Sequence, residues 1–450
     1  MAYSTADRPL IQPSHELLAD LYAVATAAVD PAPALRRRLQ ALGPGSAGRR
    51  WIIALGKAAS PMARTAVEVL SEWGDEPVGG LVVGPSPEPS PHLSLRVVPG
   101  DHPEPGAGSL AAAEALGKVA AQVTPDDEVW VLLSGGTTSL VGAPEQGLSP
   151  AELTGLYGLL LGSGLDITAM NRIRKRFSRW GGGRLARALR PARVRVYAVS
   201  DVIGDDLASI GSGPCVPDPT TAAELRRMLE EASLWDRLPP AARSLLTAVE
   251  SGETAETPKP GDQAFARVSV ELIASNRLAL EAAAKRAAEL GLAPVIAETP
   301  LAGEASAAGA SVAALLLQHC GRGKIPQPED GAPVPARCLV WGGETTVTLG
   351  ESAGLGGRCQ ELALAAARAL AGAGPGIALL AAGTDGRDGP TDAAGAIVDG
   401  DTWNAIRGAG RDPERDLGAH DAYHALDAAH ALLRPGLTGT NVMDVVIGIC

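Results

Sequence analysis

Short apolar runs alternate with longer segments of helical periodicity along most of the chain. The runs at 51–55 (WIIAL) and 129–133 (VWVLL) each lead into a glycine-containing turn. Apolar runs of this length are typical of strands that are buried on both faces, as in a parallel sheet covered by helices. The pattern therefore predicts an α/β protein in which strands and helices alternate.

The α/β pattern pauses near residue 250 and starts again at 268. Between these points, residues 251–262 (SGETAETPKPGD) are rich in Pro, Gly, Ser/Thr and charge, as linkers are. A chain of 450 residues is also too long for one compact core. We therefore expect two α/β domains, one over residues 1–255 and one over residues 263–450.

The stretch at 340–370 carries the strongest local signal for ligand binding. An extended segment leads into a glycine-rich loop, and a long Ala/Leu helix then begins at about Arg358. The first N–H groups of a helix lack internal partners and its dipole favours negative charge, so the stretch is suited to an anion. Arg358 lies at its mouth, where a guanidinium can bind a carboxylate or a phosphate through two hydrogen bonds.

A second glycine loop follows the apolar run at 129–133. The segment Ser134-Gly135-Gly136-Thr137-Thr138 has backbone N–H groups that could cradle phosphate oxygens. Two such loops in one chain predict an enzyme that handles phosphate.

Charged residues follow other predicted strands. Lys57 lies at a strand-to-helix crossing, Asp201 ends a further strand, and Asp385, Asp388 and Asp392 crowd into one glycine-rich turn. Carboxylates at the carboxyl edge of a parallel sheet are typical Mg²⁺ ligands, and a lysine there is well placed for a phosphate. The three neighbouring aspartates would repel one another unless a cation or strong donors compensate. The alternative interpretations are that Lys57 is a solvated surface residue and that the three neighbouring aspartates form an ordinary polar turn.

Two further polar features have less specific interpretations. The run at 171–189 (NRIRKRFSRWGGGRLARAL) resembles a nucleic-acid patch, but the chain carries a formal charge of −12 and the run lacks interleaved aromatics. Cationic walls for a nucleotide are the better interpretation of its basic residues. His102 lies in a turn after the strand-like segment 95–100, and a lone histidine in a turn is more often structural than a ligand.

Composition narrows the class of protein. Apolar residues make up 46% and charged residues 20%, as in soluble globular proteins. The acidic balance argues against nucleic acid and against anionic membrane surfaces as partners, and no run of about 18 apolar residues is present for a membrane span. Five cysteines without a CxxC pair suit a reducing compartment and no structural zinc site. Because Pro9 and Pro13 stand where a signal peptide would need an apolar run, we expect a cytoplasmic protein.

Two short motifs point to other enzyme classes. GxGxxG occurs at 43–48, but it follows a helix-like run and precedes a strand, which is not the dinucleotide-binding context. Residues 350–354 (GESAG) match the nucleophile elbow of α/β-hydrolases, with Ser352 as the nucleophile. The helix that should begin at this serine begins only near Arg358, so a serine esterase is kept only as an alternative. A non-catalytic nucleotide-binding protein is a further alternative.

The loops and charged segments together resemble the class II glycerate kinases, the glycerate 2-kinases with a MOFRL-type C-terminal domain. The resemblance extends from about residue 50 to 449, and the long aspartate-bearing segments are its most specific part. The matching segments are ALGKAASPMA, GDHPEP, LLSGGTTSL, NRIRKRFSRWGGGRLA, SDVIGDDLASIGSGPCVPDPTT, IASNRLALEAA, LAGEA, WGGETTVTLGESAGLGGRCQELALA, AGTDGRDGPTDAAGAIVDG and TGTNVMD.

This resemblance implies an activity and an architecture. Kinases of the family transfer a phosphoryl group from ATP, with Mg²⁺, to the 2-hydroxyl of D-glycerate, which gives 2-phospho-D-glycerate. Their site lies in a cleft between two α/β domains, the larger one Rossmann-like with a mainly parallel sheet. Residues 1–255 would form that Rossmann-like kinase domain and residues 263–450 the MOFRL-type domain. A homodimer is compatible with the resemblance, and neither a nucleic acid nor a membrane is expected as a partner.

The family's functional residues carry over at matching positions. Lys57 and Arg358 match the proposed catalytic pair, and Asp201, Asp385 and Asp388 match aspartates of the same cleft, where we expect them to hold Mg²⁺. Further candidates for binding substrate and phosphate in the matching segments are Ser134, Gly135, Gly136, Thr137, Thr138, Asn171, Arg174, Asn276 and Glu344.

Several positions depart from the family pattern. Thr137 and Thr138 stand where the glycine loop usually has Gly-Ser, Cys359 and Met443 each replace an asparagine, and Gly181 replaces a lysine. These positions lie in loops of the cleft, so they bear on substrate preference more than on phosphoryl transfer. Some relatives have been labelled hydroxypyruvate reductases, which makes that activity another alternative, although no nicotinamide fingerprint is present. The exact hydroxy acid, the nucleotide preference, the proton acceptor and the oligomeric state stay open.

Overall fold

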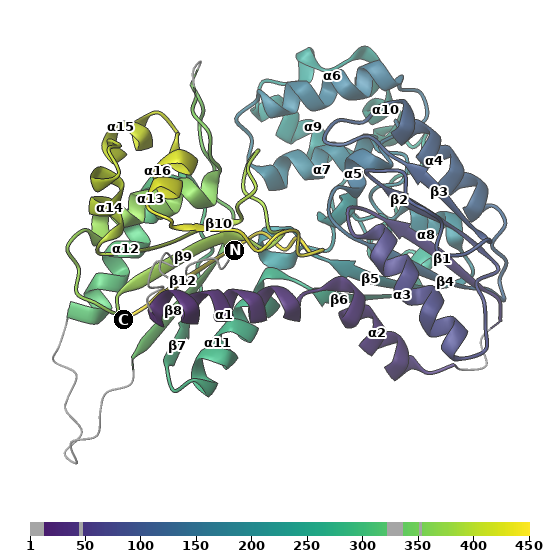
Figure 1. Ribbon diagram of the computed structural model, residues 1–450. Helices are drawn as coiled ribbons and strands as arrows, with labels where there is room; N and C mark the ends of the chain where they lie inside the picture. Colours follow the sequence, from purple (N-terminus) through teal and green to yellow (C-terminus); the bar gives the residue numbers. More distant parts are fainter. Residues whose placement is uncertain (1–12, 45–47, 322–335, 351–352) are drawn as a thin grey trace, which may run out of the picture. The chain divides into compact units, whose positions relative to one another are not determined.

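The computed structural model describes residues 13–44, 48–321, 336–350 and 353–450 (Figure 1). The chain divides into two compact units. We call Pro31–Ile273 the middle unit, and the chain up to Asp30 together with Ala274–Cys450 the terminal unit. Ser352 of the GESAG motif lies outside the described residues.

A six-stranded sheet with the order β3-β2-β1-β4-β5-β6 forms the frame of the middle unit. β1 pairs in parallel with β2 and β4, and further parallel pairs join β2 to β3 and β4 to β5. Every residue of β1, β2 and β4 is buried, as expected for apolar runs that have no solvent-facing side. The strands are β1 (Arg50–Leu55), β2 (Gly79–Gly84), β3 (Leu95–Pro99), β4 (Glu128–Leu133), β5 (Arg193–Val199) and β6 (Val268–Ala274).

Helices with apolar stripes cover this sheet. α3 begins just after β1 and buries Met62, Ala66 and Val69, whose spacing of three or four residues puts them on one helix face. α4 and α8 share a second core cluster with the other face of β1 and β4. The helices named here are α2 (Pro31–Leu42), α3 (Ala59–Glu72), α4 (Ala107–Ala120), α5 (Thr137–Leu140) and α8 (Arg184–Leu189).

Four further helices of the middle unit form a layer with a core of its own. Leu156, Phe177, Leu225 and Leu246 are fully buried in it, one from each helix. Ser149 caps the first of these helices, and its hydroxyl accepts a hydrogen bond from the N–H three residues on. The helices are α6 (Pro150–Leu161), α7 (Ile167–Phe177), α9 (Ala222–Glu231) and α10 (Pro240–Glu250).

The segment expected to be a linker, residues 251–262, is anchored within the middle unit. Thr257 Oγ1 donates a hydrogen bond to Asp218 Oδ2 (2.9 Å), and both residues are buried. The chain then contributes β6 to the sheet, so the division between the units falls after Ile273. It differs from the predicted boundary because Pro, Gly and Ser indicate irregular backbone but do not show whether side chains hold that backbone in place.

The terminal unit contains a mixed sheet with the order β11-β10-β9-β12-β8-β7. β7 and β8 are parallel, whereas β12 lies antiparallel between β8 and β9. The first residue of β12 therefore lies at the edge where β8 and β9 end. The strands are β7 (Ala293–Ile296), β8 (Arg337–Gly343), β9 (Ala378–Gly383), β10 (Gly395–Asp399), β11 (Leu432–Leu433) and β12 (Asp444–Ile449).

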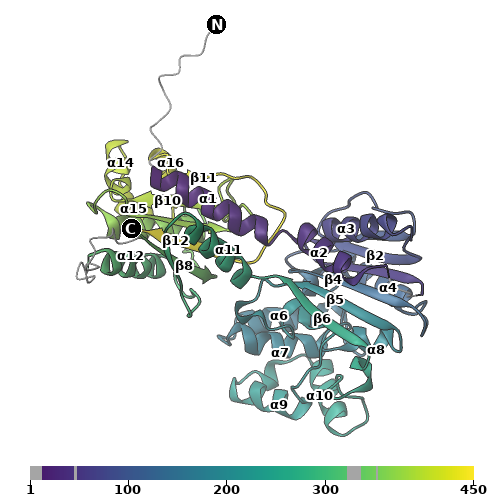
Figure 2. The same ribbon diagram turned by 90° about the horizontal axis from the view of Figure 1, so that it is seen from below.

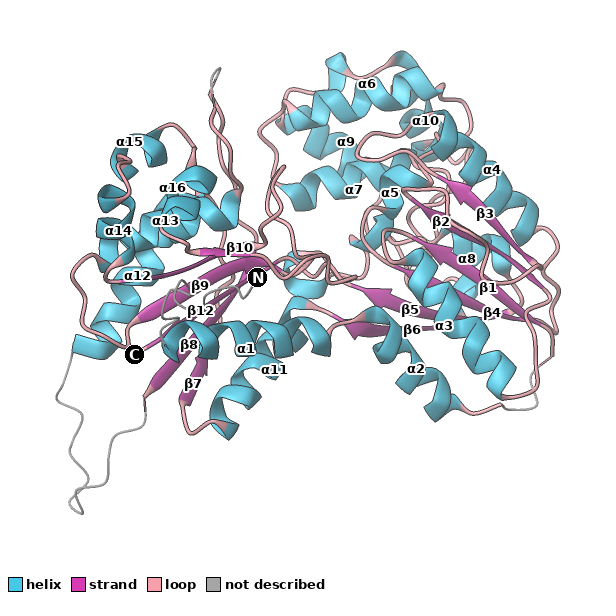
Figure 3. Cartoon of the chain, viewed as in Figure 1, coloured by secondary structure: helices cyan, strands magenta, loops and turns pink. Residues whose placement is uncertain are grey.

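Helices pack on both faces of the terminal sheet, with α12 and α13 on one face and α1 and α11 on the other (Figures 1 and 3). Among the described residues, no helix is both long and apolar enough to cross a membrane. The helices are α1 (Pro13–Ala28), α11 (Asn276–Glu289), α12 (Ala305–Gly321), α13 (Arg358–Leu370), α14 (Thr402–Gly408), α15 (Pro413–Gly418) and α16 (Ala422–Ala428).

The N-terminal helix α1 belongs to the terminal unit and lies beside α11 (Figure 2). Leu21 is fully buried, Tyr22 Oη donates to Gly383 O (2.7 Å), and Arg286 of α11 donates to Asp20 (2.8 Å). The predicted N-terminal domain, residues 1–255, included this helix. Its periodicity shows that it has an apolar face, but it does not show which sheet that face covers.

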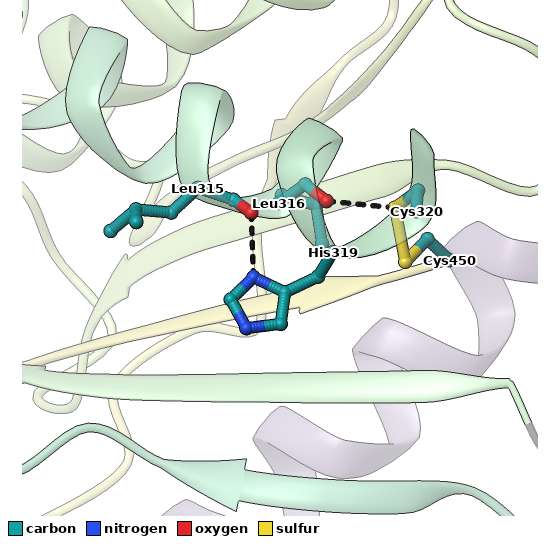
Figure 4. Close-up of a disulfide and its surroundings, with 5 residues drawn as sticks. All are labelled: Leu315, Leu316, His319, Cys320 and Cys450. Atoms are coloured by element: carbon teal, nitrogen blue, oxygen red, sulfur yellow. Dashed lines mark hydrogen bonds between the residues drawn. A yellow bond between two sulfur atoms is a disulfide. The ribbon is translucent and has the colours of Figure 1, made fainter. Parts of the chain in front are cut away.

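Cys320, at the end of α12, and Cys450, the last residue, form a disulfide (Figure 4). Their neighbourhood follows from the sheet, because Arg337 and Cys450 exchange backbone hydrogen bonds of 2.7 and 3.1 Å. The cysteine pattern had suggested a set of unpaired thiols. Cys215, Cys338 and Cys359 are free and buried, whereas the two bridged residues lie 130 positions apart, too far for spacing to reveal the pair.

Candidate active site

The strand order of the middle unit reverses between β1 and β4, and residues expected in the site gather there. Ligands of such sheets bind beyond the carboxyl ends of the strands at the reversal. The N–H of Lys57 donates to Gly135 O (2.9 Å), and the N–H of Ala58 donates to Ser134 Oγ (3.0 Å). Gly56, with φ +119°, permits this approach, because a Cβ atom there would lie 2.4 Å from Ser134 O.

The loop at 134–138 presents unpaired backbone donors. No described residue accepts a hydrogen bond from the N–H of either of its two glycines. Its hydroxyl groups are engaged within the protein: Thr137 Oγ1 donates to Ser134 O (2.7 Å), and Thr138 Oγ1 lies 2.9 Å from Ser212 Oγ. The loop therefore offers N–H groups rather than hydroxyls to an anion.

Asp201 follows β5 and lies against the same loop. A Cβ atom at Gly135 would be 1.9 Å from Asp201 Oδ2, so the carboxylate can take this place only beside a glycine. Burial raises the pKa of Asp201, and the positive charge of Lys57 opposes that shift. The structure thus brings Lys57, Gly135 and Asp201 together at the carboxyl edge of one sheet.

His102 also lies here, although the sequence indicates a structural role for it. A Cβ atom at Gly136 would be 3.2 Å from His102 Cδ2 and 3.3 Å from Lys57 Cγ. Burial, and then the charge of Lys57, lower the pKa of His102. A sequence signal for this placement exists: His102 follows β3, which is parallel to β2 and therefore ends at the same edge of the sheet.

Asn171 and Arg174, two further candidates, lie on α7 in the helical layer. The Arg174 guanidinium is 5.3 Å from the centre of the Tyr157 ring, and burial lowers the pKa of Arg174. Among the described residues, no hydrogen bond or ion pair joins either side chain to Lys57 or Asp201. The role of these two candidates in the site therefore stays a prediction.

The central part of the basic run is internal. Lys175 Nζ lies 3.5 Å from Asp218 Oδ1, Arg176 donates to Thr220 O (2.8 Å), and both basic side chains are buried. The interpretation of Lys175 and Arg176 as cationic walls for a nucleotide is therefore wrong. Their acidic partner lies about forty positions away, so the run itself does not show that its charges are neutralised.

In the terminal unit, Arg358 is the first residue of α13, as the sequence predicts. Its Nε and Nη2 donate to the two carboxylate oxygens of Asp444 (2.6 and 2.8 Å), and Nη1 lies 3.1 Å from Glu344 Oε1. Burial alone would lower the pKa of Arg358, but the hydrogen bonds and charge of Asp444 raise it. The edge of the guanidinium formed by Nε and Nη2 is therefore already hydrogen-bonded within the protein.

Asp444, which was not among the predicted site residues, holds Arg358 in place. It is the first residue of β12 and pairs with Gly343 of β8 and Gly383 of β9, so it lies at the edge where those strands end. Its side chain is buried; burial raises the pKa of Asp444, and Arg358 opposes the shift. The prediction considered only the carboxyl ends of strands, whereas an antiparallel strand brings its beginning to the same edge.

Asp388 caps α13. Its Oδ1 accepts from the N–H of Cys359 (3.1 Å) and its Oδ2 from the N–H of Gln360 (2.8 Å). Burial raises the pKa of Asp388 to about 7, against the effect of these two N–H groups. The carboxylate thus satisfies donors of the helix terminus that would otherwise lack partners.

The three aspartates expected to hold Mg²⁺ are divided between the units, with Asp201 in the middle unit and Asp385 and Asp388 in the terminal unit. Among the described residues, no group of three or more His, Cys, Asp or Glu is arranged to hold a metal ion. Both oxygens of Asp388 accept helix N–H groups, and Asp385 Oδ1 accepts from the N–H of Arg387 (3.0 Å). A resident metal ion on these three residues does not fit within either unit.

The side chain of Asn276 holds the backbone around Asp444 and does not face solvent. Its Nδ2 donates to Val442 O (2.8 Å) and Asp444 O (2.9 Å), and the residue is buried. Glu344, by contrast, is exposed beside Arg358. Of these two candidates, only Glu344 has a side chain open to solvent near the guanidinium.

The serine esterase alternative also needs a histidine that follows Ser352 in the chain, and two such histidines have structural partners. His420 Nδ1 lies 2.8 Å from Glu361 Oε2, and His424 Nδ1 lies 2.6 Å from Asp421 Oδ1. The first pair joins α13 to the segment between α15 and α16, and the second is local to the start of α16, so neither histidine is arranged around a serine among the described residues.

Comparison with known proteins links these features to a family. Residues 17–247 match the family described as a domain of unknown function (DUF4147), and residues 337–444 match the MOFRL family. The chain is 38% identical over 402 residues to the glycerate 2-kinase of Pyrococcus horikoshii, with 89% of this chain and 87% of that protein covered. It is also 38% identical over 434 residues to an Agrobacterium vitis protein named for hydroxypyruvate reductase, with 96% and 93% covered.

A solved structure gives the same result. The crystal structure of glycerate kinase from Thermotoga maritima matches with a TM-score of 0.83 and 35% identity, covering 96% of this chain and 98% of that one. The likeness thus includes both the glycine loop beside Lys57 and the MOFRL segment that contains Arg358 and Asp444. The chain therefore belongs to the glycerate kinase family with a MOFRL domain, and it is a kinase.

Proposed function

We propose that the protein transfers the γ-phosphoryl group of ATP, taken up as its Mg²⁺ complex, to the 2-hydroxyl of D-glycerate and releases 2-phospho-D-glycerate. The observation that carries this proposal is the group formed by Lys57, Asp201 and the unpaired N–H groups of loop 134–138 at the strand reversal. Relatives named glycerate 2-kinase and glycerate kinase support glycerate as the acceptor.

In this proposal, the middle unit binds the phosphates of the nucleotide. The glycine N–H groups donate to phosphate oxygens, and exposed Lys57 neutralises charge on the transferred group. Asp201 contacts the Mg²⁺ ion that the nucleotide brings, since such an ion needs only one or two protein carboxylates. Little covalent chemistry falls to the protein, because phosphoryl transfer depends mainly on positioning and charge neutralisation.

Arg358 is proposed as the second catalytic cation, through the part of its guanidinium that Asp444 leaves open. A guanidinium has five N–H donors. Asp444 accepts hydrogen bonds from Nε and from one N–H of Nη2, and Glu344 forms an ion pair with Nη1. One donor on each terminal nitrogen remains, and such a pair can bind two oxygens of a carboxylate or a phosphoryl group.

A coupled assay of ADP release across a panel of small hydroxy acids tests the function. We expect turnover with D-glycerate in the presence of Mg²⁺ and ATP, and ³¹P NMR should show the phosphate on the 2-hydroxyl. Absence of ADP release with every acid in the panel, or a product phosphorylated at the 3-hydroxyl, would contradict the proposal.

Lys57→Ala should lower kcat by about a hundredfold or more and leave Tm nearly unchanged, because the exposed ammonium acts on transition-state charge and not on packing. Steady-state kinetics and thermal melts check this, with Lys118→Ala, an exposed lysine on α4, as the control. Normal turnover in a destabilised Lys57→Ala protein would show that Lys57 is structural.

Two alternatives are tested in the same preparation. Hydroxypyruvate reductase activity, suggested by the names of two relatives, would appear as NADH or NADPH oxidation with hydroxypyruvate. We expect none, since the next element after GxGxxG at 43–48 is the strand β1 and not a helix. A fluorophosphonate probe would label Ser352 in a serine esterase, and Ser352→Ala would abolish activity. We expect neither result.

A further inference from the structure

The imidazole of His102 faces the proposed phosphate loop. His102 Nε2 would lie 3.4 Å from a Cβ atom at Gly136, and the stem of Lys57 lies against the same glycine. The N–H of Gly136 has no described acceptor. The ring therefore lies next to the groups that we propose bind the transferred phosphoryl group.

Hydrogen bonds hold the chain on both sides of His102. Asp101 Oδ2 accepts from the N–H of Ser109 (3.1 Å), and the N–H of Asp101 donates to Ser109 Oγ (3.0 Å). On the other side, Ser139 Oγ donates to Pro103 O (2.6 Å). The loop is thus attached both to the start of α4 and to α5, which fixes the position of the imidazole without using its nitrogens.

Both ring nitrogens of His102 are available to a ligand, since no described residue forms a hydrogen bond or an ion pair with either. This separates it from the histidines whose rings have polar partners in the described residues, which are His15, His92, His319, His420 and His424. His430 also lacks a partner there, but it belongs to the terminal unit and follows α16.

The surroundings of His102 favour its neutral form. Burial and then the charge of Lys57 lower its pKa, so the ring holds no proton on one nitrogen at neutral pH. Other charged groups near the loop include Asp101, which is engaged with Ser109, Asp201, which lies against Gly135, and exposed Glu104, two residues after His102. A neutral imidazole can accept a proton, which an imidazolium cannot.

We propose that His102 is the general base of the kinase, a role that rests on the function proposed above. As the acceptor hydroxyl attacks, its proton passes to His102 Nε2 and its oxygen forms a bond to the γ-phosphorus of ATP. The bond from that phosphorus to the β,γ-bridging oxygen breaks, and its electron pair leaves with ADP. The imidazolium then releases the proton to water. Asp201 is left as an anion beside Lys57, free to contact the Mg²⁺ of the nucleotide.

The test compares His102→Gln and His102→Ala with the wild type in MgATP- and acceptor-saturated kinetics between pH 5 and pH 9. We expect kcat to fall by about 10²- to 10⁴-fold in both variants, with KM for MgATP and Tm changed little. The wild-type decline in kcat on the acidic side, where His102 becomes protonated, should be absent in both. Imidazole added to His102→Ala should restore part of the rate, and His92→Ala, which alters a histidine bonded to Ser94, serves as the control.

A measurement without turnover supports the same assignment. In ¹H–¹³C NMR titrations of the full chain, the pKa of His102 should be higher in Lys57→Ala than in wild type, because a neighbouring positive charge is removed. Unchanged kcat in His102→Gln would overturn the role of His102, and so would an acidic limb that persists in His102→Gln but disappears in Asp201→Asn. Wild type that fails to release ADP with any hydroxy acid would instead contradict the kinase proposal itself.

Discussion

Among single residues, Asp444 and Arg358 form the contact that positions the second proposed catalytic cation. The pair is largely buried and joined by two short hydrogen bonds, and Asn276 holds the backbone of Asp444 from behind. Truncating one partner of such a pair leaves the other as a buried group without its counter-charge. The pair therefore fixes the direction in which the remaining guanidinium donors point.

We expect Arg358→Lys to lower kcat by about two to three orders of magnitude, because an ammonium cannot span both oxygens of Asp444 and still present a planar pair of donors. Asp444→Asn should lower kcat by about ten- to a hundredfold, since one of the two hydrogen bonds is lost and the guanidinium is misplaced. Steady-state kinetics combined with calorimetric titration of ATP tests both, and ATP affinity should change little.

The control for the Asp444 variant is Asp392→Asn. Asp392 also pairs with an arginine, Arg434, but the pair is exposed and contributes little. A loss of ATP affinity equal to the loss of kcat in Arg358→Lys would show that Arg358 binds the nucleotide rather than acting in the transfer step.

For single elements, the N-terminus of α13 has an unusual cap. Asp388 has an ordinary pKa of 3.8 in the unfolded chain and a pKa of about 7 in the fold. Between these values, the folded state holds a proton that the unfolded state lacks. The contribution of Asp388 to the unfolding free energy therefore decreases as pH rises through this window.

Asp388→Asn should remove this pH dependence, because an asparagine can still cap the helix but does not titrate. We expect the Tm of the wild type, relative to that of Asp388→Asn, to decrease as the pH is raised from 4 to 8. Thermal melts across this range check it. Asp412→Asn, which alters an exposed aspartate that caps α15, is the matched control. A Tm difference that does not vary with pH would contradict the raised pKa.

The sheet of the terminal unit depends on α1 as well as on the helices that follow it. Leu21→Ala should lower the unfolding free energy by about 2–5 kcal/mol, because a fully buried leucine is removed from between α1 and the sheet. Denaturant titration measures this, with Glu16→Ala on the exposed side of the same helix as the control. If both variants unfold alike, α1 contributes no packing energy.

Local patterns could predict these elements but not their long-range partners. The apolar run, glycine loop and Ala/Leu pattern correctly place a strand before the loop and the start of a helix at Arg358. By contrast, Thr346–Leu349 alternates like a strand, yet β8 ends at Gly343. Asp388, which caps α13, lies 28 positions from its partner Gln360 in the chain, and Asp444 lies 86 positions from its partner Arg358. No periodicity connects residues at such separations, so those two roles required the fold.

For the whole molecule, the disulfide ties the end of the chain to α12 across 130 positions. Breaking it should lower the unfolding free energy of the terminal unit by about 2–5 kcal/mol, because the unfolded chain gains freedom. Denaturant titrations with and without a reductant measure this. The Cys320→Ser/Cys450→Ser double variant should show no further response to the reductant. Free thiols at Cys320 and Cys450, found by mass spectrometry in unreduced protein, would contradict the bridge.

The composition of the chain could predict two α/β units but not how the chain is shared between them. A strand does begin at 268, but this strand, β6, belongs to the sheet of the middle unit, and the terminal unit resumes only at Ala274. The affiliation of α1 was missed, because an apolar helix face fits any apolar sheet face of suitable shape. Only the observed contacts, such as Tyr22 with Gly383, assign it to the terminal unit.

This affiliation has a consequence for synthesis on the ribosome. α1 emerges before the middle unit, but α11 and the sheet that cover it are encoded after it, from residue 274 on. At about 5–20 residues per second, the nascent α1 waits on the order of 20–85 s until the last strand of that sheet, β12, has been made. The middle unit is continuous and can fold in the meantime. The apolar face of α1, including Leu18 and Leu21, is open throughout this interval to chaperones or to the α1 of a neighbouring nascent chain.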